Sequence, residues 1–250
     1  MGGGGDIVRA LMLDVSQIAA LTFDCYGTLV DWETGILSTL KQVLSGHGAA
    51  VPPDAELLTM FAEVEARQEE GEYQSYRDVL ACVLISIASR CGVSDLPEHE
   101  QEELAESLAR WPVFPDTTAF LRAAGSKYKL CICPNVDDEL FEGTRRALNA
   151  PLDFVVTAER CRSYKPAPRH FEVALELLGL PAARVLHVAE SRRHDIEPAK
   201  RLGFQTVWVN RHGGRAGPSA SGAGEAVADL EVADLSELAG HLGLDLNAGG

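Results

Sequence analysis

The residues of this sequence that could do chemistry are polar side chains placed just after apolar runs. Asp24 follows the run Ile18–Phe23, and Asn135 follows the run Lys129–Cys133 with one proline between. Lys165 lies thirty residues beyond Asn135. A buried aspartate beside a cation stays ionised and can attack an electrophilic atom. A lone aspartate at a strand end is more often a turn residue, so the case for a nucleophile depends on the other polar residues.

Two further carboxylates follow a third apolar run, Arg184–Ala189. Glu190 comes directly after this run, and Asp195 comes five residues later. Such carboxylates can bind a hard cation such as Mg²⁺ or orient a water molecule for hydrolysis. We expect His187, inside the run, to be a core histidine with satisfied hydrogen bonds, and His194 to belong to a polar loop.

The apolar runs alternate with helical segments, which predicts a parallel sheet. Two more runs have the composition of strands, and three segments have the spacing of helices: Gln205–Asn210 and Phe154–Thr157 for the strands, and Glu139–Leu148, Arg169–Leu178 and Pro198–Leu202 for the helices. Repeated alternation of strand and helix gives an α/β fold with a parallel sheet and helices on both faces. The carboxyl ends of the strands then meet at one edge, so we expect the polar residues to converge on one crevice.

The stretch between the first and second strands is too long for a single crossover connection. From Trp32 to Trp111 it has helical patterning, which predicts a helical insertion. We therefore expect a core domain of residues 1–31 and 112–250 and a helical cap of residues 32–111.

Two other segments are assigned to the surface. The acidic residues of the insertion, among them Glu65 and Glu69, are expected to form a solvated face. The segment Gly213–Gly224 is rich in glycine, serine and alanine and is expected to be a mobile loop. After it, a short strand and a helix over Leu235–Leu242 close the fold.

Composition excludes several classes of function. The 250 residues include 22 basic and 37 acidic ones, for a net charge of −15. This charge repels nucleic acid and anionic membranes, so we expect neither as a partner, and an anionic small substrate would need its own lysine or arginine in the pocket. The amino terminus shows no export signal, and the six cysteines lack the spacing of a disulfide framework. We therefore expect a cytoplasmic protein with reduced thiols.

Four short motifs carry a family resemblance. They are Asp24-Cys-Tyr-Gly-Thr28, Pro134-Asn135, Lys165-Pro166 and Glu190-Ser-Arg-Arg-His-Asp195, in this order. In these motifs the sequence resembles the haloacid dehalogenase (HAD) superfamily of hydrolases. The resemblance implies a Rossmann-like core, an inserted helical cap that closes over the crevice and chooses the substrate, and a covalent aspartyl ester as intermediate. By the same resemblance Asp24 is the nucleophile, Lys165 balances its charge, and Thr28 and Asn135 position the substrate.

Two positions of the resemblance indicate which branch of the superfamily the chain is similar to. Phosphatases usually carry a second Asp two residues after the nucleophile, to protonate an alkoxide leaving group, whereas this chain has Tyr26. A halide leaves without a proton, so with Tyr26 at this position the sequence resembles the 2-haloacid dehalogenases. We expect Tyr26 to contact the substrate. That branch also uses an arginine early in the cap. No Arg or Lys occurs between Lys41 and Arg67, which moves this substrate-binding role to Arg67 or Arg77.

Three functional hypotheses follow. The first is a 2-haloacid dehalogenase-like hydrolase of a small carboxylated substrate, with no cofactor. The second is a Mg²⁺-dependent phosphatase of a small phosphorylated metabolite, in which Asp24, the Tyr26 carbonyl, Glu190 and Asp195 would hold the ion. The third is a non-catalytic HAD-like binding protein, since Pro134 stands where a Ser or Thr usually precedes Asn135, and proline donates no hydrogen bond. A small-molecule partner is expected in each case, and a homodimer is allowed.

Overall fold

The computed structural model describes residues 15–213 and 226–246. Its centre is a parallel sheet whose strands lie in the order β3-β2-β1-β4-β5-β6. The strands are β1 (Ala20–Phe23), β2 (Lys129–Ile132), β3 (Phe154–Val155), β4 (Val185–Ala189), β5 (Gln205–Val209) and β6 (Leu230–Val232). The five strands expected from the apolar runs are present, and β6 precedes a helix as predicted.

Strand β1 lies inside the sheet, between β2 and β4, and all four of its residues are buried, so both of its faces are covered. It pairs with β2 on one side and with β4 on the other, so Phe23 lies opposite both Ile132 and Val188. The direction of strand addition reverses between β1 and β4, and an open α/β sheet binds its ligands beside such a reversal, at the carboxyl ends of the strands. The loops after β1 and β4 carry Asp24 and Glu190.

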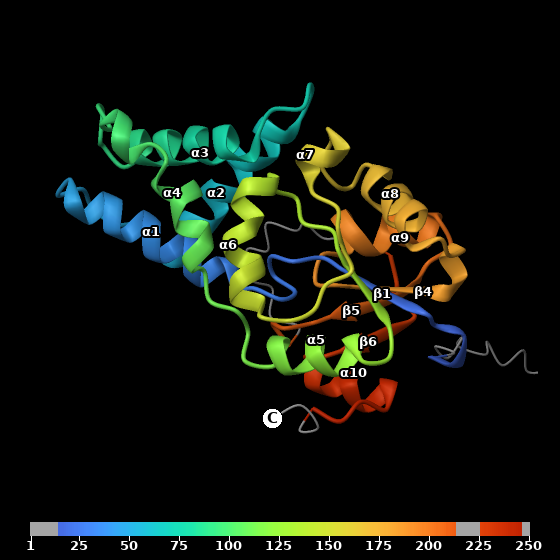
Figure 1. Cartoon of the computed structure of the whole chain (residues 1–250). Helices are drawn as coiled ribbons and strands as arrows, with labels where there is room; N and C mark the ends of the chain where they lie inside the picture. Colours follow the sequence, from blue (N-terminus) through green and yellow to red (C-terminus); the bar gives the residue numbers. More distant parts are fainter. Residues whose placement is uncertain (1–14, 214–225, 247–250) are drawn as a thin grey trace, which may run out of the picture.

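Helices cover both faces of the sheet, as Figure 1 shows. On one face, α8 (Arg169–Leu178) and α9 (Glu197–Arg201) pack around Phe171 and Phe204. On the other face, α5 (Thr117–Gly125), α6 (Asp138–Leu148) and α10 (Leu235–Leu242) join the larger apolar cluster. A short helix, α7 (Ala158–Cys161), follows β3. The sequence predicted α8 and α10 with these bounds and α6 and α9 within one residue, but it did not predict α5.

The segment between β1 and β2 is the predicted helical insertion. It contains α1 (Trp32–Gly46), α2 (Asp54–Glu69), α3 (Tyr76–Arg90) and α4 (Glu103–Ser107), followed by a 3₁₀ turn, η3 (Leu108–Arg110). In Figure 1 these helices stand together to one side of the sheet, beyond its carboxyl edge. The α/β core with an inserted helical cap is confirmed, whereas the exact domain limits at residues 31/32 and 111/112 remain a prediction.

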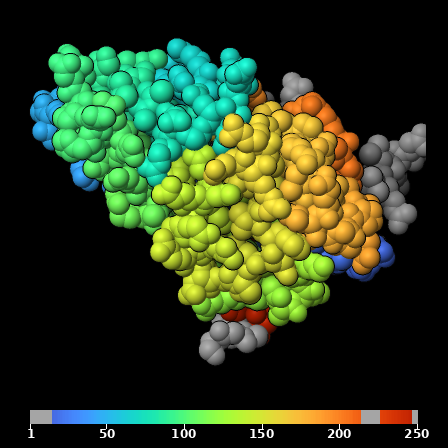
Figure 2. All heavy atoms as spheres, turned by 45° about the horizontal axis from the view of Figure 1, so that its top comes forward, coloured from blue at the N-terminus to red at the C-terminus, as the bar shows by residue number. Residues whose placement is uncertain are grey.

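Close packing and the carboxylate of Asp137 both hold the cap against the core. Gly143 of α6 approaches η3 so closely that a Cβ atom there would lie 2.3 Å from the Cβ of Ala109. Asp137, at the start of α6, accepts hydrogen bonds from the backbone N–H groups of Tyr76 and Arg77 at 3.0 and 2.9 Å. These two groups belong to the first turn of α3, where backbone donors have no partner within the helix. Figure 2 shows the cyan and green insertion lying directly against the yellow segment that follows β2.

Two expectations lie at the limits of the described structure. The predicted loop Gly213–Gly224 falls almost wholly outside the described residues, as does the amino terminus. Within residues 15–213 and 226–246, no helix has the length and apolar character needed to cross a membrane.

Candidate active site

Asp24 lies at the carboxyl end of β1 and is held by its own turn. The side chain is buried, and its Oδ2 accepts a hydrogen bond of 2.8 Å from the Thr28 hydroxyl. That hydroxyl in turn accepts a 2.8 Å hydrogen bond from the backbone N–H of Glu190, after β4. The turn requires Gly27, whose φ of 98° is unfavourable for residues with a side chain. Two strand ends are thereby joined through the oxygen atoms of Thr28 and Asp24.

Lys165 bridges the carboxylates of Asp24 and Asp195. Its Nζ lies 2.8 Å from Oδ1 of Asp24 and 2.7 Å from Oδ1 of Asp195, and the lysine is 2% exposed. Asn135 holds the lysine backbone on both sides: its Oδ1 accepts from the Lys165 N–H at 2.8 Å, and its Nδ2 donates to the Lys165 carbonyl at 3.3 Å. Burial disfavours the ammonium, but the two carboxylates outweigh it and raise the lysine pKa, so Lys165 is charged at neutral pH.

The two carboxylates that share Lys165 have different acidities. Burial raises the pKa of Asp195, but Lys165 and a hydrogen bond from His187 outweigh burial and bring this pKa to about 2. The His187 Nε2 lies 3.0 Å from Oδ1 of Asp195, and its Nδ1 lies 2.8 Å from the Thr22 hydroxyl. For Asp24 burial is the largest effect and raises the pKa, helped by the charge of Asp195 and opposed by Lys165. Asp24 is therefore the more basic carboxylate of the pair.

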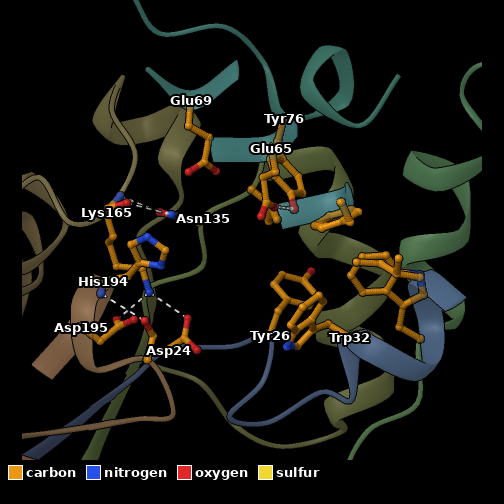
Figure 3. A pocket seen from close by; sticks show the side chains of 15 residues that line it. Asp24, Tyr26, Trp32, Glu65, Glu69, Tyr76, Asn135, Lys165, His194 and Asp195 are labelled. Carbon is orange, nitrogen blue, oxygen red and sulfur yellow. Dashed lines mark hydrogen bonds and ion pairs between the residues drawn. The ribbon is translucent and has the colours of Figure 1, made fainter. Parts of the chain in front are cut away.

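A cavity of about 90 Å³ opens above Asp24 between core and cap. Its wall includes the aromatic side chains of Tyr26, Trp32, Phe61, Tyr76 and Trp111. The two tryptophans stand where the chain enters and leaves the insertion. Figure 3 shows Asp24, Lys165 and Asp195 grouped on one side of this cavity, with Tyr26 and Trp32 on the other. The convergence predicted from the strand ends is therefore present for Asp24, Asn135, Lys165 and Asp195.

The cap contributes two carboxylates to the same cavity. Glu65 and Glu69 of α2 both line it, together with Tyr76 of α3. The Tyr76 hydroxyl donates a 2.6 Å hydrogen bond to Oε1 of Glu65. Burial raises the pKa of Glu65 to about 7 and that of Glu69 well above its ordinary value. The expectation that these two glutamates form a solvated face is wrong, since both face the cavity.

The structure assigns other positions to several predicted substrate-binding residues. Arg67 is exposed and lies 3.7 Å from Glu63, and Arg77 is paired with Glu102 at 2.8 Å, so neither side chain lines the cavity. Thr28 and Asn135 contact Asp24 and Lys165, which makes them positioning residues for the charged pair. Tyr26 does line the cavity, and its hydroxyl lies 3.0 Å from the Thr144 hydroxyl.

The cavity also contains residues that were missed or given other roles. His194 lines it from a π-helical turn, η5 (Arg192–Ile196), rather than from an irregular loop, and burial lowers its pKa to about 4, so the imidazole is neutral at pH 7. Phe61, Glu65 and Glu69 follow one another at intervals of four on one face of α2. A buried aromatic at the start of such a series was the available signal that the two glutamates face inward.

The predicted Mg²⁺ ligands do not form a suitable donor set. The Lys165 ammonium already lies between the carboxylates of Asp24 and Asp195. Glu190 does not line the cavity, because its carboxylate lies beside Gly27, where a Cβ atom would be 3.6 Å from Oε2. Within the described ranges, no three His, Cys, Asp or Glu side chains are grouped as a metal site would need. The residues present therefore do not fit the ion that the phosphatase hypothesis requires.

Comparison with known proteins identifies the family. A family model described as haloacid dehalogenase-like hydrolase matches residues 18–203. The chain belongs to the haloacid dehalogenase-like hydrolases. Haloacetate dehalogenase H-2 of Moraxella sp. (strain B) is 27% identical to this hydrolase over 80% of this chain and 88% of the relative. (S)-2-haloacid dehalogenase 4A of Burkholderia cepacia is 29% identical over 80% and 86%. A crystal structure of an L-2-haloacid dehalogenase superposes on this HAD-like hydrolase with a TM-score of 0.74 at 26% identity, covering 90% of this chain and 99% of the other.

Proposed function

We propose that this HAD-like hydrolase displaces a leaving group, such as a halide, from a saturated carbon through Asp24. One observation carries the proposal. The Asp24 carboxylate faces the cavity while Lys165 and Thr28 hold one oxygen each, at 2.8 Å in both cases. Lys165 keeps the carboxylate ionised, and enclosure removes the water that would otherwise weaken it as a nucleophile.

In the first step, an Asp24 oxygen forms a bond to the substrate carbon, and the leaving group departs with the electron pair of the broken bond. This step needs no general acid when the leaving group is a halide. Tyr26 supports that reading, because burial raises the pKa of its phenol well above the ordinary value and its hydroxyl is engaged by Thr144. The product of the step is an ester between Asp24 and the substrate carbon.

In the second step, water attacks the Asp24 carbonyl carbon and the ester bond to the enzyme carbonyl breaks. We assign the orientation of this water to Asp195. Its Oδ1 accepts hydrogen bonds from Lys165 and His187, while no hydrogen bond to its Oδ2 occurs among the described residues, so Oδ2 can accept one from the water. The departing alkoxide takes one proton of the water, through Asp195, and leaves as an alcohol. The second proton is released when Asp24 ionises again, so Asp24 is regenerated with one new oxygen atom.

Halide release tests this proposal. Bromoacetate, 3-bromopropanol and 3-bromopropylamine offer the same leaving group with different charge, and we expect at least one to release bromide. Asp24→Asn should abolish release, and EDTA should leave the rate unchanged. Retention of activity in Asp24→Asn would refute the nucleophile, loss of activity in EDTA would favour the metal-dependent phosphatase hypothesis, and no release from any compound would favour the non-catalytic hypothesis.

A cytoplasmic location and a homodimer also remain predictions.

A further inference from the structure

The charges that line the cavity do not suit an anionic substrate. Four carboxylates line it, Asp24, Glu65, Glu69 and Asp195, against a single cation, Lys165. That cation is within 2.8 Å of two of the carboxylates and is already neutralised by them. The cation of a haloacid-binding site, which we expected at Arg67 or Arg77, is therefore replaced on the cap side by negative or neutral carboxyl groups.

The Glu69 carboxylate interacts with Lys165 only through its charge, which lowers the pKa of Glu69 against the larger effect of burial. Among the described residues it forms no hydrogen bond or ion pair, whereas Glu65 is held by Tyr76. Figure 3 shows the Glu69 carboxylate directed from α2 into the space between Lys165 and Glu65. The residue is partly buried, and burial is the main cause of its raised pKa. A ligand that brings a donor or a positive charge to this carboxyl group would therefore be favoured.

The remainder of the wall suits the same kind of ligand. The aromatic side chains already described, Trp32 and Tyr76 among them, line the same cavity as the two glutamates. Aromatic rings attract ammonium groups through their electron-rich faces, and they pack against the methylene groups that carry such a charge. A pair of carboxylates backed by aromatic rings is thus suited to an alkylammonium group.

We infer that the substrate carries a primary ammonium group, which binds between Glu65 and Glu69 while its reacting carbon lies over Asp24. This inference rests on the proposed function in taking the cavity as the substrate site and Asp24 as the group that the reacting carbon approaches. A bound ammonium supplies the positive charge that both glutamates lack, and so it favours their ionised forms. A second hollow shares Glu65 and Glu69 with the cavity and is also lined by Glu70, Arg162 and Arg193, so its charges are mixed.

Binding of ligands that cannot react tests the inference separately from the chemistry. n-Propylammonium, 1-propanol and propionate have the same chain length and no leaving group, so each can be titrated into the intact protein without turnover. Indole N–H signals in ¹H–¹⁵N spectra report on the cavity: Trp32 and Trp111 line it, and Trp208 does not. We expect n-propylammonium to shift the first two signals and to bind at least about tenfold more tightly than propionate.

Matched variants on α2 then locate the site. Glu69→Gln keeps the size of the side chain and should weaken n-propylammonium binding by about ten- to a hundredfold, as expected for a charge-assisted hydrogen bond. Glu56→Gln removes an exposed carboxylate from the same helix, outside the cavity, and should leave binding within about twofold. The inference is overturned if propionate binds as tightly as n-propylammonium, if n-propylammonium does not bind, or if Glu69→Gln leaves its affinity unchanged. None of these results bears on whether Asp24 is a nucleophile.

Discussion

Replacing Lys165 by methionine tests the charge balance at the base of the site. The substitution keeps an unbranched side chain, one atom shorter, and removes the ammonium that lies 2.8 Å from Asp24 and 2.7 Å from Asp195. Each charge-assisted hydrogen bond contributes about 1.5–3 kcal/mol, and breaking a buried ion pair from one side costs about 3–5 kcal/mol. We therefore expect the free energy of unfolding at pH 7 to fall by about 3–5 kcal/mol.

The loss should depend on pH with a definite sign. In the native protein the folded pKa of Asp195 lies below its unfolded value, so this group stabilises the fold above its ordinary pKa and loses that effect as the pH falls toward about 2. Without Lys165, two adjacent carboxylates must share a buried site, and protonation of one of them relieves the repulsion. The difference between variant and wild type should therefore shrink as the pH is lowered from 8 to 5.

Urea unfolding followed by tryptophan fluorescence measures this difference at each pH. The double variant Lys165→Met/Asp195→Asn serves as a control, because it removes one of the two unpaired charges and should recover part of the lost stability at pH 8. A loss below about 1 kcal/mol, typical of an exposed ion pair, or a loss that does not change with pH, would refute the reasoning.

Three further predictions concern the cap and the nucleophile. Asp137→Ala removes the acceptor for two backbone N–H groups of α3 and for the Tyr73 hydroxyl. We expect the free energy of unfolding in urea to fall by about 1–3 kcal/mol and the cap to be proteolysed faster. An unchanged urea midpoint would contradict this. Gly35→Ala should lower the free energy of unfolding by about 1–3 kcal/mol, since its Cβ would lie 2.3 Å from Cγ of Trp111. Gly46→Ala on the same helix is the control, because its Cβ meets nothing within 4 Å, and it should be neutral or stabilising. Equal effects of the two substitutions would count against the packing argument. Halide release should fall as Asp24 becomes protonated, with a midpoint above the ordinary aspartate pKa of about 3.9 because burial raises the Asp24 pKa; a midpoint below that value in a pH–rate profile would argue against this assignment.

Most of the core could be predicted from local sequence. Strands such as β4 are continuous apolar runs because they are buried on both faces. Helix α8 ends at Leu178, directly before Gly179, a residue suited to the left-handed conformation found there. The sequence does not predict helix α5, because its first residues lie directly after Pro112-Val-Phe-Pro115-Asp116, a stretch typical of a hinge between domains. The sequence predicts a loop where the π-helical turn η5 forms, because the hydrogen bonds of this turn depend on the side chain of Ser191 and on packing against β4.

The candidate site was predicted on the core side and not on the cap side. Asp24 and Lys165 stand at strand ends or in the loops that follow, and sheet topology alone brings such positions together. The inward direction of Glu65 and Glu69 depends on how α2 is rotated against the core, which side-chain packing around Phe61 determines. The position of Arg77 depends on tertiary structure in the same way, since its partners Glu102 and Glu139 come from a later segment of the insertion and from α6 of the core.

The most direct test of the account is the fate of solvent oxygen in a single turnover. The enzyme is incubated in H₂¹⁸O in excess over the brominated substrate, so that each active site turns over at most once. The peptide that contains Asp24 is then analysed by mass spectrometry. If Asp24 attacks the substrate and water then cleaves the ester, one ¹⁸O atom enters the carboxylate of Asp24 and the alcohol formed in that first turnover is unlabelled. Label in the alcohol, with none in the Asp24 peptide, would mean that water attacks the substrate directly and would contradict the proposed role of Asp24.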